Sequence, residues 1–196
     1  FMLSVINNKL EENYEVLIIG AGAAGLAAAM TMGRLRRTVL VCDDQKPRNE
    51  ASLHMNNFPG YDGVSPADWR FKVHSELNKY PTIQLHTSRV IKLTHSDSGF
   101  NAELECGNIV KIKKILLAYG IKDQLPEIEG IKNLWGHSVV HCPYCHGFEF
   151  QDKPLALLGD GEIAIHLLSL LLGLSNDIIL FTNGSSTLTK EQKEKI

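Results

Sequence analysis

Apolar residues near the start of the chain follow the pattern of a parallel βαβ unit. A β-branched run at residues 14–19 stops at Gly20, and the following stretch 23–35 is rich in alanine and other good helix formers. A second apolar run at 38–42 is nearly continuous, which is typical of a parallel strand covered on both faces. The pattern predicts a strand, a tight turn, a helix and a second strand.

The hydrophobic period changes in the middle of the chain. Ser65 and Pro66 predict the start of a helix, with serine as N-cap and proline at the first helical position. Apolar and polar residues then alternate over 82–117, and turn signals at 96–99 and 107–108 divide this segment into short strands. We therefore expect an antiparallel β-meander here.

A second βαβ pattern closes the sequence. It begins with an apolar run at 154–158, turns at Gly159, continues as a helix to Leu174 and ends in a strand at 177–181. Its apolar stretch 163–174 is far shorter than the ~20 residues of a membrane helix. We expect a buried helix and no membrane partner.

Composition narrows the classes of partner and the location. The 196 residues include 20 Lys+Arg and 22 Asp+Glu, a net charge of −2, so no strongly basic surface is expected to bind nucleic acid. Only Cys142 and Cys145 are closely spaced, unlike the dense disulfide framework of a small secreted domain. We expect a cytoplasmic protein, with Cys42 and Cys106 as ordinary core thiols. Residues 1–14 lack the features of a secretory signal and are expected to form an irregular leader.

The motif Gly20-Ala-Gly-Ala-Ala-Gly25 lies between a predicted strand and a predicted helix, the context in which such a motif binds a dinucleotide. Gly20 allows the tight turn, Gly22 lets backbone N–H groups approach a pyrophosphate, and Gly25 lets helix and strand pack closely. Asp43, at the end of the second strand, can accept hydrogen bonds from adenosine ribose hydroxyls. We predict cofactor binding by Gly20, Gly22, Ala24, Gly25 and Asp43; the alternative is a tight turn that binds nothing.

The second fingerprint has the sequence Gly159-Asp-Gly161-Glu-Ile-Ala164 and again lies between a predicted strand and helix. Gly159, Gly161 and Ala164 are its candidate cofactor-binding residues. No acid for a ribose diol and no arginine for a 2′-phosphate stands at 182–184, so the sequence does not choose between NADH and NADPH. A fold retained without a bound nucleotide is the alternative.

The third motif is Cys142-Pro-Tyr-Cys145, flanked by histidines. Two residues between the cysteines allow a small disulfide ring, and the proline restricts the reduced loop. The rival interpretation is half of a zinc site, but the other cysteines bring no second ligand pair. We favour a redox-active disulfide and expect no metal ion.

The order of these motifs resembles the low-molecular-weight thioredoxin reductases, a class of FAD- and NAD(P)-dependent pyridine nucleotide-disulfide oxidoreductases, over about residues 14–184. The loop Asn-Phe-Pro-Gly at 57–60 is similar to the family's Asn-Trp-Pro-Gly loop, whose asparagine lies by the flavin, which implies that role for Asn57. Ala118-Tyr-Gly120 matches the family's Ala-Thr-Gly strand end near the FAD. The resemblance therefore implies that Ala118 and Gly120 also belong to the cofactor site.

The resemblance implies an α/β fold with two domains. A Rossmann-like FAD-binding domain with an antiparallel β-meander is expected at 10–122, and a second, truncated Rossmann-like NAD(P)/disulfide domain at 123–196. The closing segment of the family's FAD domain has no counterpart in this sequence. We therefore expect a fragment that binds FAD poorly.

The activity implied by the resemblance is a stepwise transfer of electrons, here called the relay. Electrons pass from NAD(P)H through FAD to the Cys142–Cys145 disulfide, and from there to a thioredoxin-like protein or a small disulfide, in a homodimer. Cys145 is implied as the flavin-side thiol and Cys142 as the exchange nucleophile. His146 stands where the reductases carry an acidic aspartate, and it is our third catalytic candidate, as a base or as a stabiliser of a thiolate. The alternative for His146 is a solvent-facing loop residue.

Two further functional hypotheses stay open. Cys-Pro-Tyr-Cys-His-Gly-Phe-Glu at 142–149 is similar to the dithiol oxidases of gliotoxin and holomycin biosynthesis, in which oxygen accepts the electrons. The family's His-Arg-Arg…Arg signature for NADPH is also missing after Ala164. A second hypothesis is therefore an FAD-dependent oxidase of small dithiols, and a third is a non-enzymatic nucleotide- or zinc-binding module.

Overall fold

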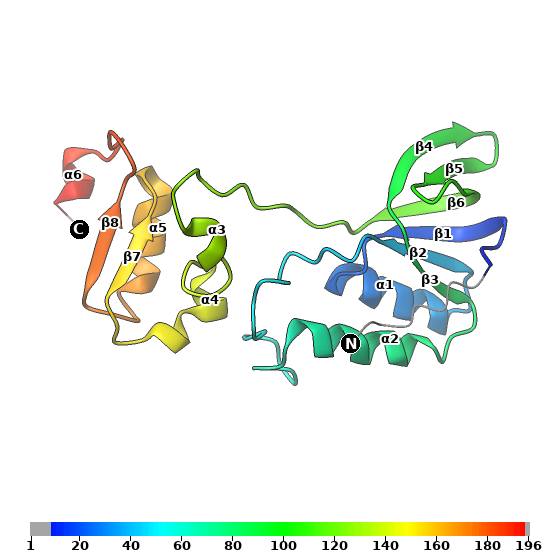
Figure 1. Cartoon of the computed structure of the whole chain (residues 1–196), viewed down its shortest axis with the longest axis horizontal. Coiled ribbons are helices and arrows are strands. Elements are labelled where there is room, and N and C mark those ends of the chain that lie inside the picture. The colour runs from blue at the N-terminus through cyan, green and yellow to red at the C-terminus, as the bar shows by residue number, and fades with distance from the viewer. Residues whose placement is uncertain (1–8, 195–196) are drawn as a thin grey trace. The chain divides into compact units, whose positions relative to one another are not determined.

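The computed structural model describes residues 9–194, which divide into two compact units (Figure 1). The first unit runs up to Leu53 and resumes over Ser65–Ile128. The second combines His54–Val64 with the chain from Glu129 onward. Most of the expected leader, residues 1–8, lies outside the described residues.

A six-stranded sheet forms the centre of the first unit, in the order β3-β2-β1-β6-β5-β4. Pairing is parallel from β3 to β6 and antiparallel from β6 through β5 to β4, which confirms the expected combination of βαβ unit and meander. The strands are β1 (Asn13–Ile19), β2 (Val39–Asp43), β3 (Ile83–Thr87), β4 (Val90–Ser96), β5 (Gly99–Leu104) and β6 (Ile109–Leu117).

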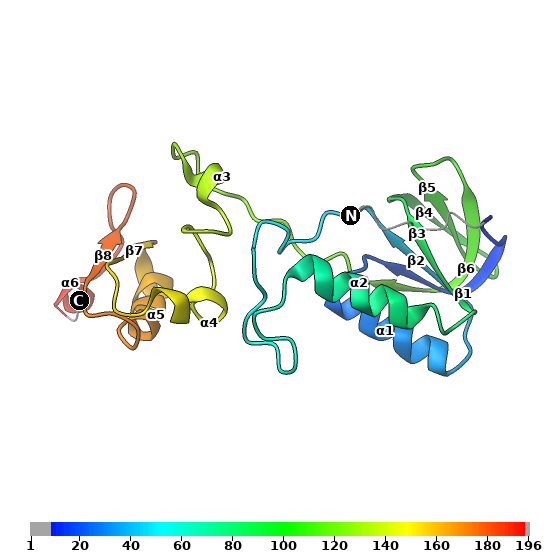
Figure 2. The same cartoon turned by 60° about the horizontal axis from the view of Figure 1, so that its bottom comes forward.

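The two long helices of this unit, α1 (Ala23–Arg34) and α2 (Pro66–Leu77), lie side by side on one face of the parallel strands (Figure 2). The N-terminus of α2 is capped as its sequence predicts, because the Ser65 hydroxyl accepts a hydrogen bond from the Asp68 backbone N–H at 3.0 Å. Pro66 occupies the first helical turn, where its missing N–H leaves no intrahelical bond unmade.

The opposite face of the sheet carries the main core. Side chains alternate along β1 and β2, so one set of buried residues meets the helices and the other meets residues of the meander. The core cluster on the meander side consists of Tyr14, Leu17, Leu40, Cys42, Ala102, Leu104, Val110 and Ile112. This packing explains why the first two strands are nearly continuous in apolar residues.

The second unit is built on a smaller scale. Strands β7 (Leu155–Leu158) and β8 (Ile178–Phe181) pair in parallel and are joined by helix α5 (Gly161–Leu171), as the second βαβ pattern predicts. Its core cluster consists of Leu157, Ala164 and Leu168. The remaining elements are α3 (Ile131–Leu134), α4 (Pro143–His146), the 3₁₀ helix η1 (Phe148–Phe150) and α6 (Lys190–Lys193).

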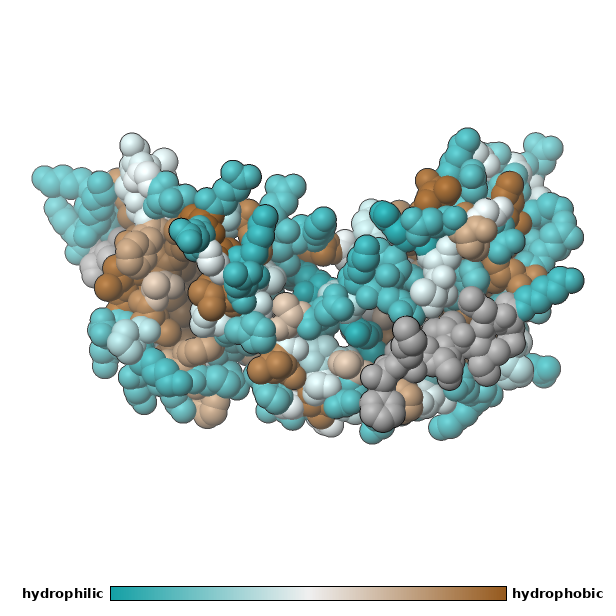
Figure 3. Space-filling model, viewed as in Figure 1, coloured by the Kyte–Doolittle hydropathy of each residue, from teal (hydrophilic) through white to brown (hydrophobic). Residues whose placement is uncertain are grey.

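Apolar side chains remain exposed on the two-stranded sheet of the second unit. Figure 3 shows them gathered over β7 and β8, and Leu158, Ile179 and Phe181 are each about half exposed. Among residues 9–194, no helix combines the length and apolar character needed to cross a bilayer.

One expectation about the cysteines is wrong. Cys42 is a buried core thiol as expected, but Cys106 is exposed. Strand β5 ends at Leu104, so Cys106 lies in the turn that leads to β6 rather than at an inward position of a strand. The alternating pattern therefore extends two residues beyond the strand that it predicts.

The close approach of α1 to β1 generates a stability prediction. A Cβ atom at Gly25 would overlap the carbonyl oxygen of Gly20 and lie 3.3 Å from Cγ2 of Ile18. We expect Gly25→Ala to lower the free energy of unfolding by about 1–3 kcal/mol, as overpacking does elsewhere. The matched control is Gly22→Ala, because a Cβ there meets nothing within 4 Å. Urea unfolding of both variants checks the prediction, and equal stabilities would contradict the close contact.

Candidate functional site

The first fingerprint begins where β1 and β6 end side by side. Gly20 has a φ of +102°, a conformation that side chains rarely adopt, and a Cβ there would overlap the Ala118 carbonyl. The Gly20 N–H donates to the Cys42 carbonyl at 2.8 Å, and the Ala118 N–H donates to the Ile19 carbonyl at 2.8 Å. A glycine at position 20 is therefore required for three strands to converge on one turn.

Beyond this turn, the N-terminus of α1 opens onto free space. Gly22 is the N-cap residue, has extended backbone geometry and receives no side-chain capping bond. The first turn of α1 contains no acidic residue, and Ala24 within it is exposed. Unpaired N–H groups and the positive end of the helix dipole favour an anion here. The arrangement fits the pyrophosphate of FAD, because a Cβ atom on Gly22 would meet nothing within 4 Å and the space beside the helix N-terminus is therefore open.

Asp43 links the end of β2 to the glycine turn. Its Oδ1 accepts a hydrogen bond from the Ala21 N–H at 2.9 Å, and its Oδ2 accepts one from the Gln45 N–H at 3.1 Å. Each carboxylate oxygen can accept more than one hydrogen bond, so both can still accept bonds from ribose hydroxyls. The structure thus places Asp43 directly beside the glycine turn.

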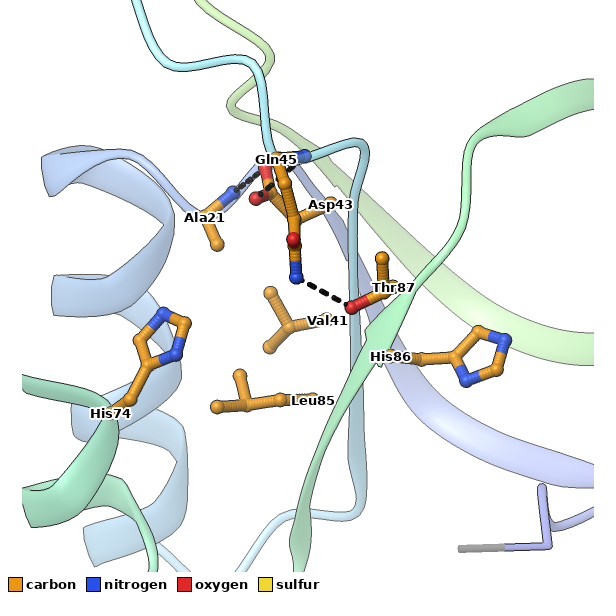
Figure 4. A pocket seen from close by; sticks show the side chains of 8 residues that line it. All are labelled: Ala21, Val41, Asp43, Gln45, His74, Leu85, His86 and Thr87. Carbon is orange, nitrogen blue, oxygen red and sulfur yellow. Dashed lines mark hydrogen bonds between the residues drawn. The ribbon is translucent and has the colours of Figure 1, made fainter. Parts of the chain in front are cut away.

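A pocket opens beside Asp43 (Figure 4). Val41 and Leu85 contribute apolar side chains to it, and the Gln45 side-chain amide donates to the Thr87 hydroxyl at 2.8 Å. A base stacked on the apolar side and a ribose at the polar side would match these surfaces. The complete lining is Ala21, Val41, Asp43, Gln45, His74, Leu85, His86 and Thr87.

His74 reaches this pocket from α2 and was not found from the sequence. Burial lowers the pKa of its imidazole, and the nearby Asp43 carboxylate opposes that effect. Within the described residues its Nε2 atom is buried and has no hydrogen-bond partner. A neutral His74 with an unused ring nitrogen can bond a polar group of a ligand. No local sequence signal marks this residue, because only the packing of α2 brings it to the pocket.

The other residues implied by resemblance lie at two places. Ala118 and Gly120 follow β6 beside the glycine turn, and Gly120 has a φ of +67°. Asn57 belongs to the second unit, where its φ is +59° and its N–H donates to Asp62 Oδ1 at 2.7 Å. Neighbouring Asn56 was not predicted to have a role.

The two cysteines of the third motif form a disulfide in the second unit. Cys142 is the N-cap residue of α4, and its Sγ atom accepts a hydrogen bond from the Cys145 N–H at 3.2 Å. Pro143 starts the helical turn that brings the sulfurs together. Asn56 holds this turn from outside, because its Nδ2 donates to the Cys145 carbonyl and to Glu149 Oε1, both at 3.0 Å.

His146 ends α4 directly after the redox cysteines. Burial lowers the pKa of its imidazole, and the Glu149 carboxylate partly offsets this effect. The ring is therefore neutral at pH 7 and can accept a proton. Partial burial also distinguishes it from the exposed loop residue that was the alternative.

The second fingerprint folds as a strand–turn–helix but carries a fixed negative charge. The Asp160 carboxylate accepts hydrogen bonds from Ser186 Oγ at 2.9 Å and from the Thr187 N–H at 2.7 Å. These bonds lower the pKa of Asp160 to about 2, and those to Thr187 have the largest effect. Asp160 is the N-cap residue of α5, so its charge lies where this fold binds a dinucleotide's phosphates.

The small residues of this second turn follow the fingerprint pattern. Gly161 has a φ of +65°, and a Cβ on Gly159 would meet the Ala164 side chain at 3.5 Å. Ala164 itself is buried against the short sheet. Among the described residues, no group of three or more His, Cys, Asp or Glu side chains is placed to hold a metal ion.

Comparison with known proteins agrees with this geometry. The chain is 35% identical over 192 residues to thioredoxin reductase aclD of Aspergillus oryzae, covering 93% of this chain and 61% of that protein. An oxidoreductase structure from Agrobacterium tumefaciens superposes with a TM-score of 0.88 at 33% identity, covering 93% of this chain and 62% of that one. For the putative thioredoxin reductase TrxB of Bacillus anthracis the TM-score is 0.89 at 28% identity, with 92% and 61% covered.

The chain therefore spans about 60% of the length of these relatives. A family model described as pyridine nucleotide-disulphide oxidoreductase matches residues 14–196, which is nearly the whole sequence. With two dinucleotide-type turns and a disulfide of CxxC spacing in the same chain, the conclusion is direct: this protein belongs to the pyridine nucleotide-disulphide oxidoreductase family.

Proposed function

We propose that this protein is an FAD-dependent disulfide oxidoreductase of the thioredoxin-reductase type. Electrons pass from NAD(P)H by way of FAD to the Cys142–Cys145 disulfide and then to a thioredoxin-like protein or a small disulfide. The observation that carries the proposal is the presence in one chain of a glycine turn with a pocket beside Asp43 and of a CxxC disulfide. We assign FAD binding to 10–122 and the redox disulfide with NAD(P) binding to 123–196.

The residues of the first unit would hold FAD by its adenosine diphosphate half. Backbone N–H groups at Gly22 would bind the pyrophosphate, and Asp43 would accept the ribose hydroxyls. The pocket faced by His74 would take the base. FAD, when bound, supplies the two-electron redox chemistry. Asn57, Ala118 and Gly120 remain assigned to the cofactor by family resemblance.

The cysteines would then act in thiol–disulfide exchange. The reduced Cys142 thiolate attacks one sulfur of the substrate disulfide, and the other substrate sulfur leaves as a thiolate. Cys145 attacks the mixed disulfide, which re-forms the Cys142–Cys145 bond and releases the second substrate thiol. The Cys145 N–H, already directed at Cys142 Sγ, stabilises negative charge on that sulfur. Neutral His146 accepts a proton from a thiol or returns one to the departing thiolate.

A second candidate, the FAD-dependent oxidase of a small dithiol, is favoured by one observation. The fixed negative charge of Asp160 at the start of α5 repels the phosphates of a nicotinamide dinucleotide. In that reaction the dithiol substrate would replace NAD(P)H as electron donor: it would reduce the Cys142–Cys145 disulfide and leave as a disulfide, the electrons would pass to FAD, and oxygen would accept them. A homodimer is proposed from the family resemblance, and a cytoplasmic location from the cysteine spacing, which is not that of a secreted disulfide framework.

Gly22 provides a test of the flavin site. We expect Gly22→Val to weaken FAD binding at least tenfold, about 1.4 kcal/mol, because the side chain fills the pyrophosphate space and its Cβ atom meets no protein atom within 4 Å. Titration of the protein into FAD, followed by quenching of flavin fluorescence, measures this. Unfolding in urea should show the same stability as the unsubstituted protein. Unchanged affinity in a folded variant would remove the glycine turn from the proposal.

Asp160 provides a test of the electron donor. NADPH added anaerobically to the FAD-loaded protein should bleach the flavin slowly, and Asp160→Asn should lower the NADPH concentration for half-maximal rate about two- to fivefold by removing the repulsion. Asp152→Asn, an exposed acid of the same unit outside the motif, is the matched control. Bleaching by a dithiol but never by NADPH, in either variant, would reject the reductase in favour of the oxidase.

The two cysteines should differ spectroscopically. We expect Cys142→Ser to keep a long-wavelength band between the Cys145 thiolate and oxidised flavin, and Cys145→Ser to lose it, because Cys145 is assigned to the flavin side. Absorbance of the FAD-loaded variants measures the band. A band that follows Cys142 instead would reverse the assignment, and turnover unaffected by both substitutions would overturn the disulfide mechanism.

A further inference from the structure

A second reactive thiol lies far along the sequence from the redox disulfide, in the turn between β5 and β6. The Sγ atom of Cys106 is 3.6 Å from Nε2 of His86, which lies on β3 twenty residues earlier. The Asn108 side-chain amide donates to the same sulfur at 3.3 Å. Cys106 is exposed, so a dissolved reagent can reach the sulfur. Cys106 and Asn108 have no part in the proposed relay, and His86 only contributes to the lining of the pocket beside Asp43.

His86 is the buried member of this cluster. Only 8% of its surface is exposed, and its Nδ1 atom has no hydrogen-bond partner among the described residues. Its ring points away from the nucleotide pocket, toward the opposite face of the sheet (Figure 4). A proton on Nδ1 would be a buried unpaired donor, which is unfavourable. The tautomer with the proton on Nε2 avoids this and donates to the sulfur of Cys106.

The charge on sulfur is stabilised from several sides. The pKa of Cys106 is lowered to about 7, first by the hydrogen bond from His86 and then by the Asn108 backbone N–H. The Ser88 hydroxyl and the Asn108 side-chain amide lower it further, while slight burial of the thiol raises it. Cys42 on β2, which is paired with His86 in the strand register, also interacts electrostatically with this sulfur. Burial raises the pKa of Cys42 to about 12. One thiol is therefore a ready nucleophile and its neighbour is inert.

We propose that Cys106 is a modification site that forms mixed disulfides with low-molecular-weight disulfides. The Cys106 thiolate attacks one sulfur of the disulfide, and a new S–S bond forms while the original one breaks. The second half leaves as a thiolate and takes a proton from water, so Cys106 is oxidised and the departing half is reduced. No further oxidant is needed. The proposal does not depend on the function assigned to the CxxC disulfide.

The test uses glutathione disulfide as the probe and the 196-residue chain with its CxxC disulfide closed. Cys106 falls on tryptic peptide 93–111 and Cys42 on peptide 38–48, so mass spectrometry follows each thiol separately. At pH 7 a thiol with the pKa of Cys106 has about sixteenfold more thiolate than an ordinary thiol of pKa ~8.5. Each thiolate of lower pKa is, however, about fivefold less reactive as a nucleophile. We therefore expect Cys106 to react roughly threefold faster than an ordinary exposed thiol, and Cys42 to stay unmodified.

The hydrogen bond from His86 should be visible in how the Cys106 reaction rate depends on pH, which a merely structural role of His86 would not change. His86→Leu removes the strongest of the bonds to the sulfur, so the pKa of Cys106 moves toward that of an ordinary thiol and its intrinsic nucleophilicity rises. The Cys106 rate should then fall by up to about threefold at pH 7 and exceed the unsubstituted protein's rate above about pH 8. Asn108→Ala should shift the dependence of the Cys106 rate on pH in the same direction, by a smaller amount. Because Asn108 lies in an exposed turn, this variant keeps the test valid if His86→Leu does not fold. Cys106→Ser should lose the adduct on peptide 93–111. Equal labelling of Cys42 and Cys106, or profiles that do not cross, would overturn the proposal.

Discussion

The close approach of backbone to backbone at the first glycine turn is the constraint on which the first unit depends. At Gly20 the chain reverses against the carbonyl of Ala118, and at Gly25 the helix rests on the carbonyl of Gly20. No side chain larger than hydrogen fits either position without displacing main-chain atoms. The ends of β1, β2 and β6 meet here, so one geometric requirement assembles both the sheet edge and the anion-binding end of α1. Asp43 ties its strand to the same turn.

The second unit repeats this architecture with a different electrostatic outcome. Both helices begin at a turn of the same type, but α1 begins beside open space whereas α5 begins beside a carboxylate held by Ser186 and Thr187. An anion is therefore favoured at one helix terminus and opposed at the other. The same fold element can thus support a tightly bound cofactor in one unit and a weakly bound donor, or none, in the other.

The parts of the structure that were predictable are those that local sequence specifies. Strand and helix periods, the Ser65 cap and the two glycine turns each depend on a few neighbouring residues, and the structure contains them. His74 was missed because its place at the pocket follows from how α2 packs on the sheet. Cys106 was misplaced because alternation continues past the end of β5, and only the turn geometry reveals that its side chain is exposed. Tertiary neighbours, which a linear pattern does not contain, decide both cases.

The hydrogen bond from Asn56 to the Cys145 carbonyl has a consequence for the order of folding. The cysteines are three residues apart, so their own ring closes at little entropic expense as soon as that segment is synthesised. The amide that orients the turn comes from 89 residues earlier, and the whole β-meander lies between the two partners. Oxidation can therefore precede correct placement. The redox group acquires a fixed direction only when the loop that carries Asn56, a part of the second unit, lies against the cysteine turn.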